Sequence, residues 1–93
     1  MELSYAPPAK RSVLIAGHQT SISLEPMFWA MLEQAARRRG GAINALVAAI
    51  DAERLGAPRP PNLTSAIRQW LVTEALADRG GEGGTAIGGM VEP

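Results

Sequence analysis

Residues 19–24 read Gln19-Thr20-Ser21-Ile22-Ser23-Leu24, and Glu25-Pro26 follows them directly. Successive side chains of a β-strand point to opposite faces, so this alternation of polar and apolar residues predicts a short strand. Proline is favoured at the first position of a helix, because that position needs no N–H donor. The segment therefore predicts a strand that passes straight into a helix beginning at Pro26.

The two faces of the predicted strand differ in chemistry. Thr20, Ile22 and Leu24 lie on one side, which is mainly apolar and has to pack against a core. Gln19, Ser21 and Ser23 lie on the other side, which is polar and carries no charge. Gln pairs with adenine and Ser with several bases in the major groove of DNA, so this side could contact base edges. It could also be the solvent face of an amphipathic strand, and the pattern alone favours that simpler interpretation.

The strand needs a partner, because a lone strand leaves its edges unsatisfied. Residues 12–16, SVLIA, are rich in β-forming side chains and predict further strand, which Gly17-His18 interrupts. Residues 12–24 therefore form either one long bent strand or a hairpin that turns at Gly17-His18. The simplest partner outside the chain is the same strand of a second copy, antiparallel across a two-fold axis.

Two helices are predicted after the strand. The first runs from Pro26 to about Arg39 and stops at Gly40-Gly41. It is apolar on almost all sides between residues 27 and 32, which predicts burial against either a partner subunit or a third helix. The second helix runs from about Ala42 to Leu55 and has a regular apolar stripe.

A third helix is predicted from about Thr64 to Ala77, with Asn62 or Thr64 as its N-cap. The Pro-rich residues 56–61 form a stiff linker before it, because proline fixes φ and disfavours helix at the preceding residue. Residues 79–93 are rich in glycine, and we expect them to be disordered.

Composition limits the function. The chain has 93 residues, enough for one small domain, and it has no cysteine, which excludes disulfides and thiolate metal sites. His18 is the sole histidine, so we predict no metal and no cofactor. No third group is spaced to orient a serine and His18 for nucleophilic catalysis, so we predict that the chain is not an enzyme. It shows no signal peptide and no membrane span, which predicts a cytoplasmic protein.

The net charge is zero, but the charges are not evenly distributed. Residues 1–50 carry five Lys and Arg against three Glu, a net charge of +2. Residues 51–93 carry four Arg against six Asp and Glu, a net charge of −2. A local basic face decides attraction to phosphate, and the basic groups lie in the half that holds the strand.

The order strand, Leu-Glu-Pro, helix, Gly-Gly, helix resembles the ribbon-helix-helix family, whose Arc and methionine repressors place β-strands in a DNA groove. The segments KRSVLIAGHQTSISLEPMFW and NLTSAIRQWL together look like a subgroup of small bacterial members that add a third helix. The resemblance covers about residues 10–77. It implies a mainly α fold with a short β-ribbon, built as an intertwined homodimer with an additional C-terminal helix.

The resemblance also implies roles for residues. The strands of the dimer would form a ribbon in the major groove, with Gln19, Ser21 and Ser23 facing the bases. The phosphates would be contacted by the start of the second helix and by basic side chains: Lys10, Arg11, Arg37, Arg38, Arg39, Ala42, Ile43 and Asn44. The dimer core would contain Ile22, Leu24, Phe28, Leu32, Ile43, Leu46, Val47 and Ile50.

Two positions depart from the family. Ala42 stands where many relatives have a capping Ser or Thr, and Ser23 stands where relatives often have a long Arg or Lys. Both differences predict weaker or more shape-dependent DNA binding, unless residues 10–18 or the N-terminal arm add contacts.

Three functions are compatible with this sequence. The first is a dimeric DNA-binding transcriptional regulator of the repressor type. The second is an antitoxin-like or adaptor protein, whose residues 57–93 bind a partner protein. The third is an oligomerisation module that binds no DNA. The predicted division is a flexible arm (1–9), a ribbon-helix-helix core (10–56), a linker with the third helix (57–78) and a disordered tail (79–93).

Overall fold

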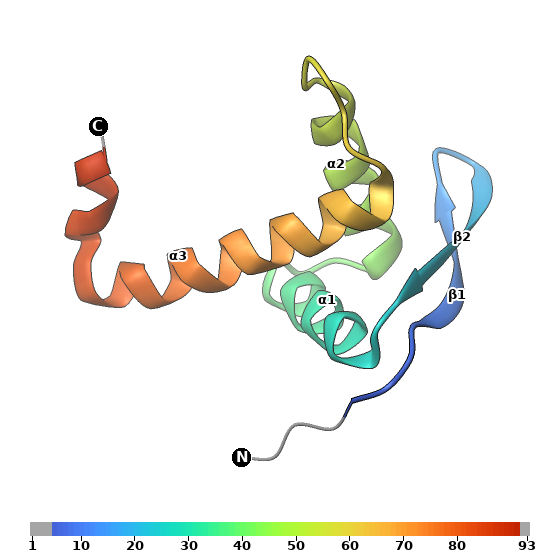
Figure 1. Cartoon of the computed structure of the whole chain (residues 1–93), viewed down its shortest axis with the longest axis horizontal. Helices are drawn as coiled ribbons and strands as arrows, with labels where there is room; N and C mark the ends of the chain where they lie inside the picture. The colour runs from blue at the N-terminus through green and yellow to red at the C-terminus, as the bar shows by residue number, and fades with distance from the viewer. Residues whose placement is uncertain (1–4, 92–93) are drawn as a thin grey trace.

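The computed structural model describes the backbone of residues 5–91 and the side chains of residues 5–78. Two strands are followed by three helices (Figure 1). The elements are β1 (Ala9–Ile15), β2 (His18–Leu24), α1 (Pro26–Arg38), α2 (Ile43–Leu55) and α3 (Leu63–Val91). This is the predicted β-ribbon with helices, and the third helix is present.

The two strands form an antiparallel hairpin within one chain. The turn consists of Ala16 and Gly17, which have φ values of 50° and 83°. Positive φ at both central residues is the requirement of the type I′ turn, whose twist matches that of the flanking strands. Of the two alternatives open for residues 12–24, the hairpin is therefore the one observed, with its turn one residue earlier than Gly17-His18.

The hairpin changes the expected pairing of β2. The lone strand was expected to pair with the same strand of a second copy, but β1 of the same chain pairs with it from Ala9↔Leu24 to Ile15↔His18. One edge of β2 is thus occupied within the chain, because the β-forming segment SVLIA continues upstream to Ala9 and folds back. Pairing with a second copy stays a prediction for the other edge.

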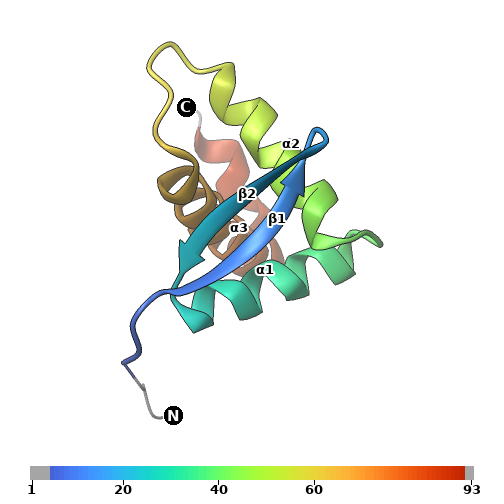
Figure 2. The same ribbon diagram turned by 90° about the vertical axis from the view of Figure 1, so that its right-hand side faces the viewer.

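One apolar core is enclosed by the hairpin and the helices. Figure 2 shows the hairpin lying across α1 and α2, with α3 behind it. Residues predicted for the dimer core fill this intrachain core: Ile22, Leu24, Leu32, Leu46, Val47 and Ile50 are buried, and the half-buried Phe28 and Ile43 pack against them. The core thus forms within one copy, and the intertwined dimer stays a prediction.

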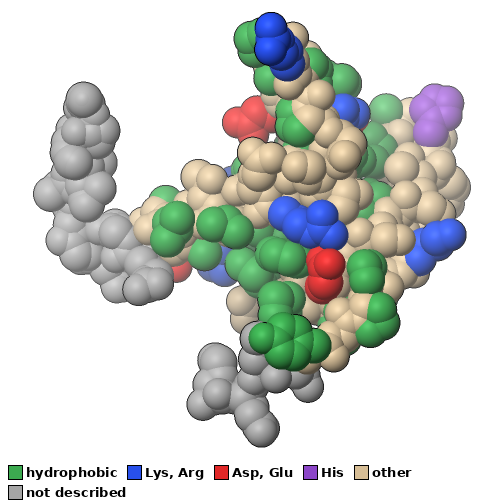
Figure 3. Space-filling model, in the orientation of Figure 1, with side chains coloured by type: hydrophobic (Ala, Val, Ile, Leu, Met, Phe, Trp, Pro, Cys, Tyr) green, Lys and Arg blue, Asp and Glu red, His purple; other side chains and the backbone are tan. Residues whose placement is uncertain are grey.

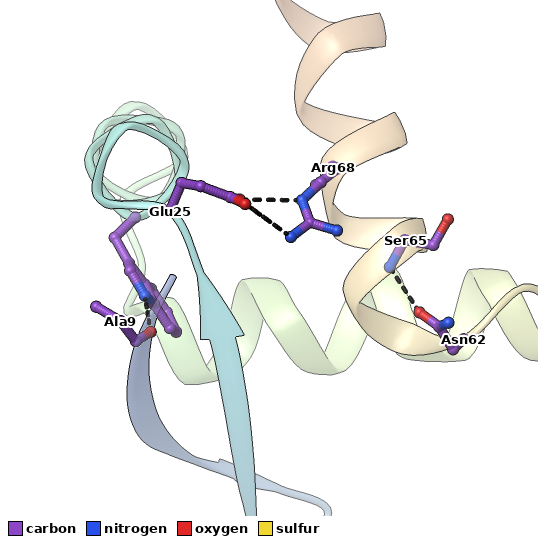
Figure 4. Close-up of polar contacts among 6 residues, drawn as sticks. Ala9, Glu25, Asn62, Ser65 and Arg68 are labelled. Atoms are coloured by element: carbon purple, nitrogen blue, oxygen red, sulfur yellow. Dashed lines mark hydrogen bonds and ion pairs between the residues drawn. The ribbon is translucent and has the colours of Figure 1, made fainter. Parts of the chain in front are cut away.

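Helix α3 supplies a large part of that core. Ala66, Ile67 and Leu71 are buried, and α3 packs on both α1 and α2. Of the two explanations for the nearly all-apolar start of α1, cover by the third helix is therefore the one seen in this chain. Asn62 caps α3, because its Oδ1 accepts a hydrogen bond from the Ser65 backbone N–H at 2.8 Å (Figure 4).

The chain ends differ from the predicted boundaries. Helix α3 continues to Val91, beyond the predicted end at Ala77. The side chains of residues 79–93 lie outside the described part, so the predicted disorder of the Gly-rich tail stays a prediction. At the N-terminus, residues 5–8 have no regular structure, residues 1–4 lie outside the described part, and the strand begins at Ala9 instead of Ser12.

Candidate nucleic-acid interface

The face of the hairpin that points away from the helices is polar, and we call it the outer face. Val13, Ile15, Ile22 and Leu24 are buried on the opposite side. Because directly paired residues of an antiparallel ladder share a face, the outer face consists of three cross-strand pairs. These pairs are Lys10 with Ser23, Ser12 with Ser21, and Leu14 with Gln19.

The three residues predicted to contact bases all lie on this outer face. Gln19 and Ser21 are exposed, whereas Ser23 is half-buried near the start of α1. Leu14 completes the face next to the turn and is 43% exposed. The sole histidine, His18, lies at the exposed tip of the hairpin (Figure 3). The face therefore offers amide and hydroxyl groups and one apolar side chain.

Sequence reasoning missed one member of this face. The Ser12 hydroxyl donates a hydrogen bond to Oε1 of Gln19 at 3.1 Å across the hairpin. The two residues are diagonal neighbours, since Ser12 pairs directly with Ser21. The contact exists only in a hairpin with this register, so the undecided choice between hairpin and bent strand concealed it.

The predicted phosphate-contacting cations fall into two groups. Arg11 stacks over the Trp29 ring at 4.4 Å and pairs with Glu33 at 3.2 Å. Arg39 stacks over Trp70 at 5.0 Å and pairs with Glu74 at 3.0 Å in the same way. Within the described side chains, Lys10, Arg37 and Arg38 are exposed and have no ion pair, so they are the cations most available to phosphate.

The start of α2 lies beside β1. Ala42 is the N-cap and provides no side-chain hydrogen bond, as the missing hydroxyl predicted. The backbone N–H groups of Ile43 and Asn44 stand in the first turn, where no intrahelical acceptor exists. Asn44 Oδ1 accepts a hydrogen bond from the Leu14 backbone N–H at 3.2 Å. Through its Oδ1, the Asn44 side chain thus ties α2 to the hairpin, a structural role separate from the predicted phosphate contact.

The same contact defines the edges of the hairpin. Because the Leu14 N–H points to Asn44, Leu14 and Gln19 do not exchange backbone hydrogen bonds with each other. Pairs with and without such hydrogen bonds alternate along an antiparallel ladder, so Ser12–Ser21 and Lys10–Ser23 also lack them. The backbone groups of Gln19, Ser21 and Ser23 therefore point away from β1. No hydrogen bond to these groups is found among the described residues, so the outer edge of β2 is unpaired there.

An ion pair links α3 to Glu25, the residue between β2 and α1. Two nitrogens of Arg68 contact the Glu25 carboxylate, the shortest distance being 3.0 Å (Figure 4). The Arg68 guanidinium lies 5.8 Å from the centre of the Phe28 ring. A backbone N–H hydrogen bond, at Glu25 itself, and the Arg68 contact lower the pKa of this carboxyl from its ordinary value. The start of α1, directly after the predicted base-contacting strand, is therefore tied to α3, 43 residues further along the chain.

A family model described as ribbon-helix-helix domain matches residues 8–75, which is most of the chain and all five elements as far as the middle of α3. The chain belongs to the ribbon-helix-helix family. Ribbon-helix-helix domains are in general DNA-binding regulators or antitoxin-type proteins that form dimers and are typically not enzymes. Comparison with curated proteins and with solved structures gave no match.

Two further findings concern other classes of site. Among residues 5–78, no three His, Asp or Glu side chains come together in a way that could hold a metal ion. None of the helices, over the residues described, has the length and apolar character needed to cross a membrane.

Proposed function

We propose that this ribbon-helix-helix protein is a homodimeric transcriptional regulator that binds specific DNA sequences in the bacterial cytoplasm, as a repressor does. The observation that carries the proposal is the outer face of the hairpin. It is exposed and uncharged at Gln19 and Ser21, and a cation, Lys10, stands on the same face. Amide and hydroxyl groups discriminate bases in the major groove, and cations bind the phosphates that border it.

Phosphate binding would come from the surroundings of that face. Lys10, Arg37 and Arg38 are exposed, and the uncapped start of α2 offers backbone N–H groups to an anion. Arg11 and Arg39 keep 45% and 51% of their side chains exposed beside their carboxylate partners. Because affinity from phosphates falls with salt, we expect binding to weaken steeply between low and physiological ionic strength.

The homodimer would form through the unpaired edge of β2. A second copy can pair with this edge antiparallel across a two-fold axis, since the backbone groups of Gln19, Ser21 and Ser23 point outward. The edge is short and has no lysine or proline, and no hydrogen bond to its backbone is found among the described residues.

Two proline variants test the dimer. Proline removes an N–H, and at edge strands it is tolerated where that N–H points outward. Ser21→Pro should shift the protein to monomer in analytical ultracentrifugation while leaving its circular dichroism unchanged. Ser12→Pro is the matched control, because Ser12 is the cross-strand partner of Ser21 and its N–H points to the opposite edge. A Ser21→Pro variant that dimerises as the wild type does would rule out this interface.

DNA binding is tested by selection of fragments from the genome that encodes the protein, followed by mobility shifts at low salt. The double variant Gln19→Ala with Ser21→Ala should lose preference for the selected sequence and keep its binding to unrelated DNA. If the double variant still prefers the selected fragments, the base-contacting assignment is wrong. If the wild type binds no fragment at low salt, the protein is an oligomerisation module instead.

An antitoxin-like or adaptor function is the second candidate. Val72 and Leu76 are 46% and 60% exposed on α3, which leaves apolar side chains for a partner protein. Truncation at Gly56 cannot test it, because Ile67 and Leu71 belong to the core. The double variant Val72→Lys with Leu76→Lys should stay folded and release a co-purifying partner, whereas unchanged co-purification would exclude this surface.

A further inference from the structure

The width of the sheet limits which strands can enter DNA. In the proposed dimer, the two β2 strands pair with each other and each keeps its own β1, which gives a sheet of four strands. Neighbouring strands lie about 4.8 Å apart, so the two outer strands are separated by about 14 Å. The major groove is about 12 Å wide, which admits a two-stranded ribbon and excludes a flat insertion of all four strands.

We propose that the two β2 strands alone contact the bases, whereas each β1 lies over a phosphate backbone at one rim of the groove, with Lys10 as its phosphate-contacting residue. The inference rests on the proposed function and on dimerisation through β2. It divides the outer face of the hairpin by strand. Gln19, Ser21 and Ser23 belong to the base-contacting part, and Lys10 and Leu14 do not.

The charge distribution in the hairpin supports this division. The one cation of the outer face, Lys10, is on β1, and β2 has no Lys or Arg. Arg11, also on β1, lies on the opposite face beside Trp29 and Glu33 and does not count toward the division. Lys10 points outward from the same face as the base-contacting side chains, because it pairs directly with Ser23. A strand above a phosphate backbone gains from cations, whereas a strand against base edges gains from amide and hydroxyl groups.

The position of α2 supports it independently. The hydrogen bond between the Leu14 N–H and Asn44 places the start of α2 against the outer edge of β1, on the side away from β2. The first-turn N–H groups of a helix favour an anion. A phosphate near Ile43 would thus lie farther from the centre of the sheet than β1 does. This is the arrangement expected when β1 lies over a phosphate backbone at the rim of the groove.

Three single variants of the full chain test the division on a selected DNA fragment and on unrelated DNA. Lys10→Ala should weaken binding to both DNAs by a similar factor. It should also reduce the slope of log K against log salt by about 2, since the dimer loses two phosphate contacts. Leu14→Ala should leave the selected sequence unchanged. Ser21→Ala, the positive control for base contact, should change it.

The alternative is that one hairpin enters the groove by itself, as a complete two-stranded ribbon. Leu14 would then contact a base edge near the turn, and Leu14→Ala would alter the selected sequence, most readily at a thymine methyl group. That result, or a Lys10→Ala variant with an unchanged salt slope, overturns the division. A wild-type protein that binds no DNA instead overturns the proposed function, so the two failures are distinguishable.

Discussion

The hydroxyl of Ser12 and the amide oxygen of Gln19 are joined by a hydrogen bond of 3.1 Å between neighbouring strands. The bond engages one side of the Gln19 side-chain oxygen, and the Gln19 NH₂ group makes no side-chain hydrogen bond within the described part of the chain. Bidentate recognition of adenine by Gln needs an oxygen and an NH₂ group held in one plane toward the base. Ser12 therefore restricts the conformations of the longest of the three side chains predicted to contact bases.

Removal of this hydrogen bond should reduce base discrimination without removing it. We expect Ser12→Ala to lower the preference for the base opposite Gln19 by less than Gln19→Ala does, since a good Gln–adenine pair contributes about 1–3 kcal/mol. Competition between selected and single-base-changed DNA measures the effect. Ser12→Thr keeps the hydroxyl and suits a strand, so it should restore the preference. A Thr variant as poor as the Ala variant would assign Ser12 a different role.

The junction between β2 and α1 could be predicted from sequence, whereas the pairing of β2 could not. Strand alternation and Pro26 both act locally, and the structure begins α1 at Pro26 as predicted. The hairpin depends on Ala16 in a left-handed conformation, which alanine rarely adopts, so the usual Asn-Gly signal was absent. Local pattern therefore leaves the partner of β2 undetermined, whereas burial of Val13 and Ile15 in the core favours β1 of the same chain.

The conformation of the turn predicts how substitutions at Ala16 and Gly17 change stability. Ala16 has φ of 50°, and a left-handed conformation costs an L-residue other than Asn or Gly roughly 1 kcal/mol or more. Ala16→Asn should therefore raise the free energy of unfolding by about 0.5–1 kcal/mol, measured by urea denaturation. Gly17→Ala should lower it, because Gly17 has φ of 83° although the space around it is open. Equal stability of the two variants would mean that the turn adopts another type.

Charge predictions from sequence were less complete than fold predictions. Arg11 and Arg39 were expected at phosphates, and the structure shows each on a tryptophan ring and beside a carboxylate. These partners are 18 to 35 residues away in the sequence, so no local pattern could indicate them. Lys10 has no such partner in the described structure, and this difference depends on how the helices pack, which the sequence around Lys10 does not encode.

Helix α3 should be essential for the fold of the whole chain. Leu71 is 2% exposed and Leu76 is 60% exposed on the same helix, so they form a matched pair. Leu71→Ala should reduce the free energy of unfolding by about 2–5 kcal/mol, because it leaves a cavity in the core. Leu76→Ala should change it by less than about 0.5 kcal/mol. Similar small effects in both variants would mean that α3 is not packed as described.

The ion pair between Glu25 and Arg68 should make stability depend on pH in one direction. The pKa of Glu25 is lowered in the folded chain, first by a backbone N–H hydrogen bond at Glu25 and then by Arg68. The folded state therefore favours the carboxylate, so its contribution is present above the pKa of the unfolded chain. That contribution is lost as the pH falls through the lower folded value.

We accordingly expect Glu25→Gln to be less stable than the wild type at pH 7, with a gap that closes as the pH falls below 4.5 and the carboxylate of the wild type is protonated. Urea denaturation at several pH values between 7 and 3 measures the gap. Glu53→Gln serves as the control, because Glu53 is exposed and has no ion pair among the described side chains. A gap for Glu25→Gln that stays constant down to pH 3 would show that the loss of stability does not come from the charge of Glu25.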